Sequence, residues 1–272
     1  MRDTDQSISR YATGDARERL FAALRASGLV PEVLQPDALA ESDQFHSGGT
    51  AATGDVARAV GIGLGTRVLD VGSGIGGPAR FFAQLGAVVT GVDVTEEYVR
   101  LARELNAACA MAGSITMLLA PAQDTKLPAG SFDAAAMLHV GMNLADKQAV
   151  FTEVHRLLRP GGVFGVYDLM GTNTLGYPLP WADAASASYV ESDESYVNHL
   201  RAAGFIVTEN TDRSAAVLKQ MAEEAAAERL SPTPLGGLNL LGSDPEARVA
   251  NELAAFKSGA LAPRLLIAVR PV

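Results

Sequence analysis

From Thr66 onward the chain alternates short apolar runs with longer segments in which apolar residues recur every three or four positions. Short apolar runs between turn residues predict strands, and the longer periodic segments predict helices. The predicted strands of this region are residues 66–71, 87–92, 115–119, 132–139 and 162–168. The predicted helices are residues 77–85, 95–111 and 145–158. Because such alternation is typical of βαβ units, the sequence predicts an α/β fold around a parallel sheet.

The two ends of the chain depart from this alternation. Residues 7–30 form an amphipathic segment that Gly28 and Pro31 end, which predicts a helix before the first strand. After residue 168 the order is less regular. The elements predicted there are a helix at 192–203, a strand at 205–210, helices at 214–229 and 245–257 on either side of a loop at 230–243, and a last strand at 264–270.

A glycine-rich turn follows the first predicted strand, with the sequence Asp70-Val71-Gly72-Ser73-Gly74-Ile75-Gly76-Gly77. Glycines let a ligand approach the backbone closely, and open α/β sheets bind ligands at this edge. The glycine spacing also fits the dinucleotide fingerprint, but a single match of that kind is weak. Asp70 would lie badly beside the phosphates of NAD, whereas S-adenosylmethionine (SAM) has no phosphate and carries a positive sulfonium and a positive amino group. The charge pattern therefore favours SAM.

A second carboxylate follows the next predicted strand. Asp93 stands about twenty residues after the turn, where a carboxylate can accept hydrogen bonds from both hydroxyls of a ribose. The alternative is that Asp93 only caps the helix that begins near Thr95. The preceding turn favours the ribose contact.

Composition and charge narrow the class of protein. The chain has 272 residues, 48% of them hydrophobic and 19% charged, which is ordinary for a globular protein with a sizeable core. No apolar run approaches the ~18 residues of a membrane span, and the first residues lack the apolar region of a signal peptide. The single cysteine, Cys109, fits a reducing cytoplasm. A net charge of −9 argues against a nucleic-acid partner. We therefore expect a cytoplasmic protein with neither a membrane nor a nucleic acid as partner.

The chain resembles the class I SAM-dependent methyltransferases over about residues 42–270. Within them it is similar to the small-molecule branch that includes sarcosine/dimethylglycine N-methyltransferases and many natural-product methyltransferases. The segments that carry the resemblance are Asp43-Gln44-Phe45-His46-Ser47-Gly48-Gly49, residues 68–80 around the glycine turn, Leu138-His139-Val140-Gly141-Met142-Asn143 and Leu157-Leu158-Arg159-Pro160-Gly161-Gly162.

The resemblance implies a Rossmann-like, doubly wound sheet of seven strands whose last strand is antiparallel, under a helical cover. Residues 1–50 would form the N-terminal part of this cover, and residues 51–272 would form the SAM-binding methyltransferase domain. Insertions near 169–190 and 214–262 would complete the cover. Such a cover would enclose the substrate and exclude water.

The resemblance also implies contacts with the cofactor, whose product is S-adenosylhomocysteine (SAH). Asp70 would face the amino group, Asp93 the ribose and Val94 the adenine, while Leu138 would border the sulfonium. Three glycines would pass close to the methionine part of the cofactor, namely Gly72, Gly74 and Gly76.

One segment departs from the family pattern. Family members commonly have an Asp before the Ala whose backbone contacts adenine, and here Pro121 precedes Ala122. The backbone contact at Ala122 carries over. The contact with the adenine amino group would come from Gln123 or Asp124 instead, or be weaker.

Two histidines are the candidate catalytic residues, because the resemblance places both near the methyl group. His139 ends the fourth predicted strand, and either acts as a base or orienting group or only stabilises the loop. His46 acts as a base or positions the substrate, unless it is a lid contact to the cofactor or a simple loop residue. Trp181 is a candidate for substrate binding or a hydrophobic anchor of the cover. Tyr11 either folds over the site or is an ordinary surface residue.

We therefore expect a SAM-dependent methyltransferase that transfers a methyl group by direct displacement to nitrogen or oxygen of a small molecule. One alternative is a methyltransferase-like SAM-binding protein with non-methyl chemistry, and an NAD-dependent oxidoreductase is the less favoured alternative because of Asp70. The four histidines show no metal-ligand spacing, so we expect no metal. The sequence permits a homo-oligomer and does not identify the methyl acceptor.

Overall fold

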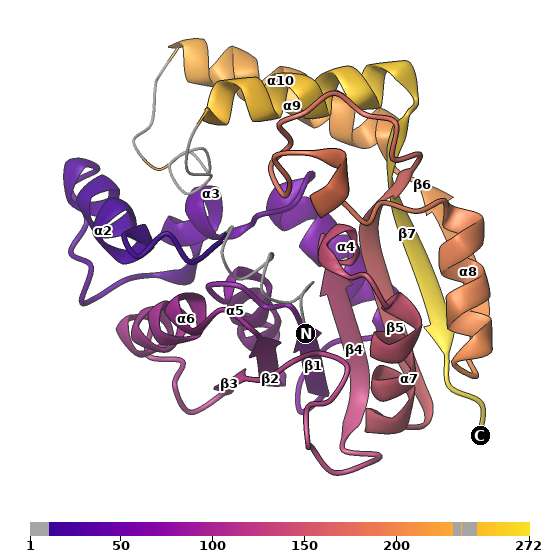
Figure 1. The fold of residues 1–272 in the computed structure, drawn as a ribbon. Helices are drawn as coiled ribbons and strands as arrows, with labels where there is room; N and C mark the ends of the chain where they lie inside the picture. The colour runs from indigo at the N-terminus through magenta and orange to yellow at the C-terminus, as the bar shows by residue number, and fades with distance from the viewer. Residues whose placement is uncertain (1–10, 231–234, 236–243) are drawn as a thin grey trace.

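The computed structural model describes residues 11–230, 235 and 244–272. Its centre is a seven-stranded sheet with the strand order β3-β2-β1-β4-β5-β7-β6 (Figure 1). The strands are β1 (Arg67–Val71), β2 (Val88–Asp93), β3 (Ile115–Leu119), β4 (Phe132–Leu138), β5 (Leu158–Gly171), β6 (Ile206–Asp212) and β7 (Leu261–Val269). Neighbouring strands from β3 to β5 pair in parallel, whereas β7 pairs antiparallel with both β5 and β6. The expected doubly wound sheet with an antiparallel last strand is confirmed.

The strand order reverses between β1 and β4. The chain runs outward from β1 to β3 and then returns to place β4 on the other side of β1. Ligands of open α/β sheets bind beyond the carboxyl ends of the strands at such a reversal. The glycine turn after β1 and His139 after β4 both lie at this point.

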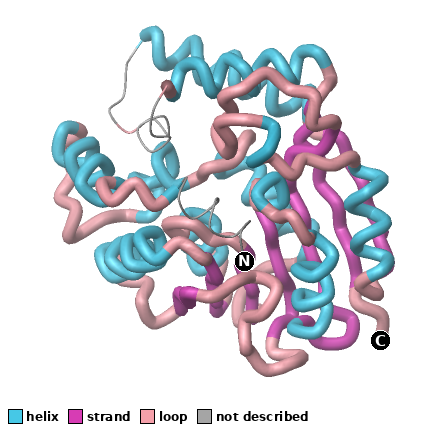
Figure 2. The backbone as a smooth tube through the Cα atoms, in the orientation of Figure 1, coloured by secondary structure: helices cyan, strands magenta, loops and turns pink. Residues whose placement is uncertain are grey.

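Helices cover both faces of the sheet because adjacent strand residues point to opposite faces. On one face, α4 (Gly49–Val60), α5 (Gly77–Gln84) and α6 (Glu96–Ala108) pack over a core that includes Val68. On the other face, α7 (Lys147–Leu157) and α8 (Asp193–Ala202) pack over a core that includes its neighbour Leu69. The result is a three-layer arrangement (Figure 2).

Further helices lie above the carboxyl ends of the parallel strands. The N-terminal ones are α2 (Ala16–Ala26), the 3-10 turn η1 (Pro36–Leu39) and α3 (Ala40–Asp43), and the C-terminal ones are α9 (Ser214–Leu230) and α10 (Pro245–Ser258). Figure 1 shows α9 and α10 across the top of the molecule, over the end of the sheet toward which the parallel strands point. Two short 3-10 turns, η2 (Gly141–Asn143) and η3 (Ala185–Ala187), follow β4 and β5. The division of the chain at residue 50 stays a prediction.

Several bounds differ from those that the sequence pattern predicts. Within the segment 7–30, which is described from residue 11, the structure has the helix α2 at Ala16–Ala26, so this helix is shorter than predicted. Most of the loop predicted at 230–243 lies outside the described residues. The fifth strand begins four residues earlier and ends three later than the apolar run 162–168. It is longer because Leu158 pairs with Phe132 of β4 and because Gly171 still pairs with Leu261 of β7. No helix in the described part of the chain combines the length and apolar character that a membrane crossing needs.

Candidate functional site

The glycine turn takes backbone conformations that side chains disfavour. Gly72, Gly74 and Gly76 have φ angles of +68°, +52° and +87°. A Cβ on Gly72 would also lie 2.5 Å from a methyl carbon of Val140, in the loop after β4. The absence of a side chain at Gly72 thus lets the turn after β1 contact the loop after β4.

Asp70 lies at the end of β1 beneath this turn. Its side chain is only 1% exposed, and Oδ2 has no hydrogen-bond partner. Burial and the nearby Asp93 raise the pKa of Asp70 to about 7, although Arg80 opposes the change. A buried carboxyl oxygen without a partner is unfavourable unless a donor or cation reaches it. The unpartnered atom therefore fits the positive amino group that the sequence analysis assigned to this position.

Asp93 connects the end of β2 to the same turn. Its Oδ2 accepts a hydrogen bond from the backbone N–H of Gly74 at 2.9 Å, and Oδ1 accepts one from Thr95 at 2.8 Å. Burial raises the pKa of Asp93, and these hydrogen bonds oppose the change. The second bond goes to Thr95, the residue before α6, and α6 has no side-chain cap hydrogen bond, so the structure does not bear out the capping alternative. A carboxylate has about four acceptor positions, so capacity remains for ribose hydroxyls. That contact stays a prediction.

The remaining predicted cofactor residues lie at the same edge of the sheet. Val94 directly follows β2 and is half-buried, as is Ala122 beyond β3. Gln123 is exposed, and Leu138 is a buried residue at the end of β4. Their contacts with adenine and sulfonium stay predictions.

The structure brings the two candidate histidines together. The imidazole of His139 stacks on the ring of Tyr167, with 5.4 Å between centroids and 15° between planes. The ring of His46 meets both edge-on, at 5.9 Å from His139 and 6.1 Å from Tyr167. His139 has a φ of +53°, unusual for a residue other than glycine, and its N–H donates to the carbonyl of Tyr167 at 2.8 Å.

Hydrogen bonds fix the tautomer of His46. The Thr53 hydroxyl donates to Oε1 of Gln44 at 2.7 Å, so it can only accept at its 3.0 Å contact with Nε2 of His46. Nε2 also lies 3.0 Å from the carbonyl oxygen of Gly49, which is an acceptor. The proton is therefore on Nε2, and Nδ1 carries the lone pair.

Both imidazoles are neutral near pH 7. Burial lowers the pKa of His46 to about 4, although the Gly49 carbonyl opposes this change. Burial and the neighbouring His46 lower the pKa of His139 well below its usual range. Nε2 of His139 is buried without a hydrogen-bond partner.

Comparison with known proteins gives this arrangement a family. Residues 69–166 match the family described as a methyltransferase domain, and they span the glycine turn, Asp93 and His139. Over these residues the chain is thus similar to a methyltransferase domain. The resemblance on which the sequence analysis relied is confirmed at this level.

The similarity to curated proteins is confined to the domain. A sterol 24-C-methyltransferase of Gibberella zeae is 34% identical over 119 residues, which are 43% of this chain and 31% of that protein. The match thus covers about a third of the length of the curated relative. Among solved structures, the [4+2]-cyclase SpnF has 24% identity and a TM-score of 0.67, and the similarity covers 97% of this chain and 96% of the cyclase. Geranyl diphosphate C-methyltransferase from Streptomyces coelicolor A3(2), in complex with Mg²⁺, geranyl-S-thiolodiphosphate and SAH, has 18% identity and a TM-score of 0.70, with 98% of each chain covered. These structures show the fold.

Tyr167 lies in this cluster of rings, although the sequence did not single it out. Its hydroxyl is buried without a hydrogen-bond partner, and burial raises its pKa. The residue stands near the carboxyl end of the strand beside β4, at the same edge as His139. The apolar pattern predicted both strands but not that they pair with each other, so it could not place the two rings in contact.

A buried ion pair that the sequence analysis also missed joins the N-terminal cover to the domain. Arg80 of α5 lies 2.9 Å from Asp43 of α3, and both side chains are at most 2% exposed. Arg80 also donates to Asn106 at 2.7 Å and to the carbonyl of Ile75 at 2.8 Å. Asp43 and Arg80 both belong to segments that carry the family resemblance, and this shared membership is the feature of the sequence that could have pointed to the pair.

The two predicted substrate-binding residues differ in position. Trp181 is 4% exposed in the core of the cover, and its indole N–H donates to the Ser188 hydroxyl at 3.0 Å. This placement favours the anchor alternative. Tyr11 is half-buried, and its hydroxyl is 3.4 Å from Oδ1 of Asn143 in the loop after β4. Substrate binding by either residue stays a prediction.

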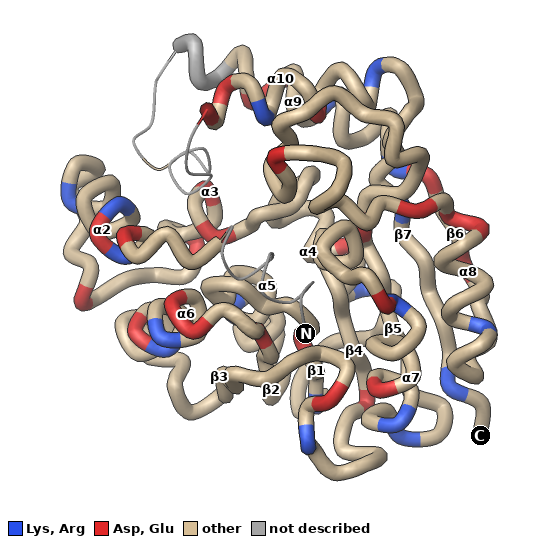
Figure 3. The backbone as a smooth tube through the Cα atoms, viewed as in Figure 1, with Lys and Arg blue, Asp and Glu red and all other residues tan. Residues whose placement is uncertain are grey.

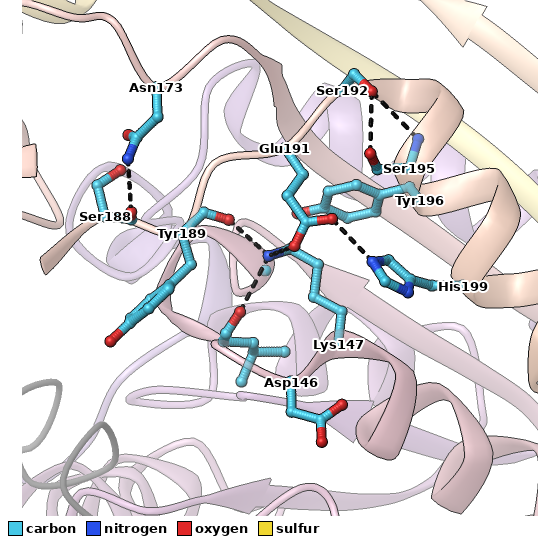
Figure 4. A network of polar contacts seen from close by, with 12 residues as sticks. Asp146, Lys147, Asn173, Ser188, Tyr189, Glu191, Ser192, Ser195, Tyr196 and His199 are labelled. Atoms are coloured by element: carbon cyan, nitrogen blue, oxygen red, sulfur yellow. Dashed lines mark hydrogen bonds and ion pairs between the residues drawn. The ribbon is translucent and has the colours of Figure 1, made fainter. Parts of the chain in front are cut away.

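A buried lysine connects this loop to the cover insertion (Figure 4). The Lys147 ammonium donates to the carbonyl oxygens of Leu144, at 3.0 Å, and of Tyr189, and it pairs with Glu191 at 3.0 Å. The other carboxyl oxygen of Glu191 lies 2.8 Å from His199. These contacts hold the segment after β5 against the loop that carries His139.

Proposed function

We propose that this chain is a SAM-dependent methyltransferase that transfers a methyl group to nitrogen or oxygen of a small molecule. The observation that carries the proposal is the buried, unpartnered carboxyl oxygen of Asp70 at the glycine turn. The methyltransferase domain family and the SAH in the complex of the Streptomyces coelicolor relative support it. The single cysteine and the acidic net charge support a cytoplasmic enzyme without a nucleic-acid partner.

In this proposal, residues of the chain bind the cofactor and orient it. Asp70 would receive the amino group of the cofactor and Asp93 its ribose, while the glycines of the turn leave room for its methionine part. When bound, SAM supplies a methyl group that its sulfonium already activates. Alignment and exclusion of water can then supply much of the catalysis.

The neutral imidazoles suit a site that faces a sulfonium, because neither adds a like charge. The lone pair of the acceptor heteroatom forms the new bond to carbon as the sulfur–carbon bond breaks and its electron pair stays on sulfur. A proton on that heteroatom leaves to water once the new bond has formed. Because burial makes His46 and His139 weak bases, they are better suited to hold the acceptor by hydrogen bonds than to remove its proton.

A second candidate function has a specific observation in its favour. The [4+2]-cyclase SpnF is similar over almost the full length of both chains. The second candidate is therefore a SAM-binding protein of this fold with non-methyl chemistry.

The test combines binding with turnover. Calorimetric titration with SAM and SAH should show binding to the wild-type protein and a loss of at least tenfold in affinity for D70N. Incubation with SAM and a panel of amines, phenols and carboxylates should then release SAH. Binding without SAH release on any acceptor favours the second candidate, and absence of binding contradicts both.

A further inference from the structure

Seven buried side-chain atoms in the described part of the chain have no hydrogen-bond partner. Four of them belong to Arg or Asn side chains that form a hydrogen bond or an ion pair through another of their atoms. The other three belong to Asp70, His139 and Tyr167, whose side chains form no hydrogen bond with any other described residue. Burial of a polar group without a partner is unfavourable, so a bound molecule that supplies the partner would be stabilised at each of these positions.

These three side chains stand at the carboxyl ends of three neighbouring strands. Asp70 belongs to β1, His139 follows β4 and Tyr167 belongs to β5, and β4 lies between the other two in the sheet. Asp70 pairs with Ala136 of β4, and Tyr167 pairs with Leu138, two residues further along that strand. Residues two apart on a strand point to the same face, so Asp70 and Tyr167 share a face of the sheet.

The order of the strands gives an order of binding positions. The proposed function puts the amino group of SAM at Asp70 and its sulfonium beside Leu138, so the methionine part of the cofactor runs from β1 to β4. The next strand in this direction is β5, which lies about 10 Å from β1 because neighbouring strands are about 4.8 Å apart. In a direct displacement, the acceptor approaches the methyl group from the side opposite the sulfur. Tyr167 thus stands beyond the sulfonium, on the side away from Asp70.

The Tyr167 hydroxyl does not contribute to packing. His139 stacks on the Tyr167 ring, His46 meets it edge-on, and a Cβ on Gly48 would lie 3.2 Å from the hydroxyl oxygen. The side chain is only 2% exposed. A phenylalanine would offer the same ring to these neighbours without burying an unpartnered hydroxyl. The hydroxyl is therefore unfavourable for the ligand-free protein, and a contact with a bound molecule accounts for it.

A hydroxyl of the bound molecule suits this position. A tyrosine hydroxyl donates and accepts hydrogen bonds, and so does a ligand hydroxyl, so the two can bond in either direction. Lys and Arg lie mainly on outer helices and turns (Figure 3). The buried guanidinium of Arg248 in α10 donates to the carbonyl oxygen of Leu179 and pairs with Asp183, and Arg213 pairs with Asp55 at 3.4 Å. An uncharged hydroxyl requires no counter-charge from these cations.

We propose that the Tyr167 hydroxyl is a specificity-determining group that forms a hydrogen bond with a hydroxyl of the methyl acceptor, on the side of the sulfonium away from Asp70. This inference rests on the proposed methyltransferase function and narrows its substrate class to alcohols and phenols. A site with a buried hydrogen-bonding group rejects an analogue that lacks the matching group, because the buried group is then left unpaired.

Phenol and toluene test this preference, since toluene has a methyl group in place of the hydroxyl. Each is titrated into the SAH-loaded full-length protein, and binding is followed by NMR spectroscopy. We expect phenol to bind about tenfold more tightly than toluene, or better. Y167F should reduce this preference to about twofold or less, because it removes the hydrogen-bonding group and keeps the ring. Its affinity for SAH should stay unchanged, since the hydroxyl lies beyond the sulfonium.

Y196F is the matched control. The Tyr196 hydroxyl is also buried, but it donates to Oδ2 of Asp168 at 3.2 Å, and the ring packs in the core on the other face of the sheet. Y196F should therefore unfold at a lower urea concentration than the wild type and keep its preference for phenol. Y167F should unfold at a urea concentration no lower than that of the wild type, because its hydroxyl has no partner to lose.

Four results would overturn the inference. They are toluene binding as tight as that of phenol, no detectable binding of phenol, an unchanged preference in Y167F, and a Y167F protein destabilised as much as Y196F, which would give the hydroxyl a structural role. Failure of the proposed function has a different signature, namely a wild-type protein that does not bind SAH. The titrations are repeated without SAH, so the preference is measured in either case.

Discussion

Asp70 makes cofactor binding depend on pH. With its pKa near 7, the carboxyl is half protonated at neutral pH, because burial and Asp93 disfavour its charge more than Arg80 favours it. A cationic amino group favours the ionised form, so binding lowers this pKa and releases a proton below pH 7. We predict that SAM affinity rises about tenfold between pH 6 and pH 8, since only the ionised fraction binds well. Calorimetry in two buffers of different ionisation enthalpy measures the proton release.

The variant D70N separates this effect from a general loss of structure. It should bind SAM weakly and without the pH dependence. Its ligand-free form should unfold at no lower temperature than the wild type at pH 8, because a carboxyl whose folded pKa is raised destabilises the folded state once it is ionised. A D70N protein that keeps the wild-type pH profile would show that another group titrates.

Single residues were predictable from the sequence where their role depends on neighbouring residues in the chain. The acidic residues at the glycine turn and after β2 follow from strand ends and charge, and the structure places both at the expected edge. Tyr167 could not be selected in the same way. Its position in the site depends on ring contacts with His139 and with His46, which lies far earlier in the chain, and on burial that only the packed structure creates.

The close contact between the turn after β1 and the loop after β4 leads to a prediction at the scale of elements. G72A should destabilise the protein and reduce SAH affinity, because Ala would need a φ of +68° and would lie 2.5 Å from Val140. Left-handed backbone alone costs about 1–2 kcal/mol. G65A is the matched control for that cost, since Gly65 has a φ of +75° but no atom within 4 Å of an added Cβ.

Denaturant unfolding and calorimetry distinguish the two contributions. G72A should lose more unfolding free energy than G65A, and only G72A should lose SAH affinity. The double variant G72A/V140A should recover part of the difference because it removes the steric conflict. If G65A and G72A are equally destabilised, the turn and the loop after β4 are not in the close contact described above.

Elements were predictable to the extent that their pattern is local. The alternation of strands and helices led to the correct fold class, and α5 and α7 end within one residue of their predicted ends. The extent of β5 was not predictable, because its last residues pair with β7, about ninety residues later in the chain. Pairing between distant strands, and not a local apolar run, decides where that strand ends.

At the scale of the whole molecule, a segment outside the sheet, between the N-terminal helices and α4, completes the cluster of rings. The segment before α4 contributes His46, while the carboxyl ends of β1 and β4 contribute the glycine turn and His139. Periodicity predicts that such helices exist but not where they dock, since docking depends on individual contacts such as Asp43 with Arg80.

The buried ion pair should therefore control both stability and cofactor release. D43N leaves the Arg80 guanidinium buried without its counter-charge, which should cost about 3–5 kcal/mol of unfolding free energy. E104Q is the matched control because Glu104 pairs with Arg17 of α2 at 2.7 Å in an exposed position, where an ion pair contributes about 0–1 kcal/mol. D43N should also release SAH faster, since the segment that carries His46 follows directly after Asp43, whereas E104Q should not. Urea denaturation and stopped-flow displacement of SAH measure the two effects. If D43N lies within 1 kcal/mol of the wild type and releases SAH at the same rate, the ion pair does not hold the N-terminal cover over the cofactor.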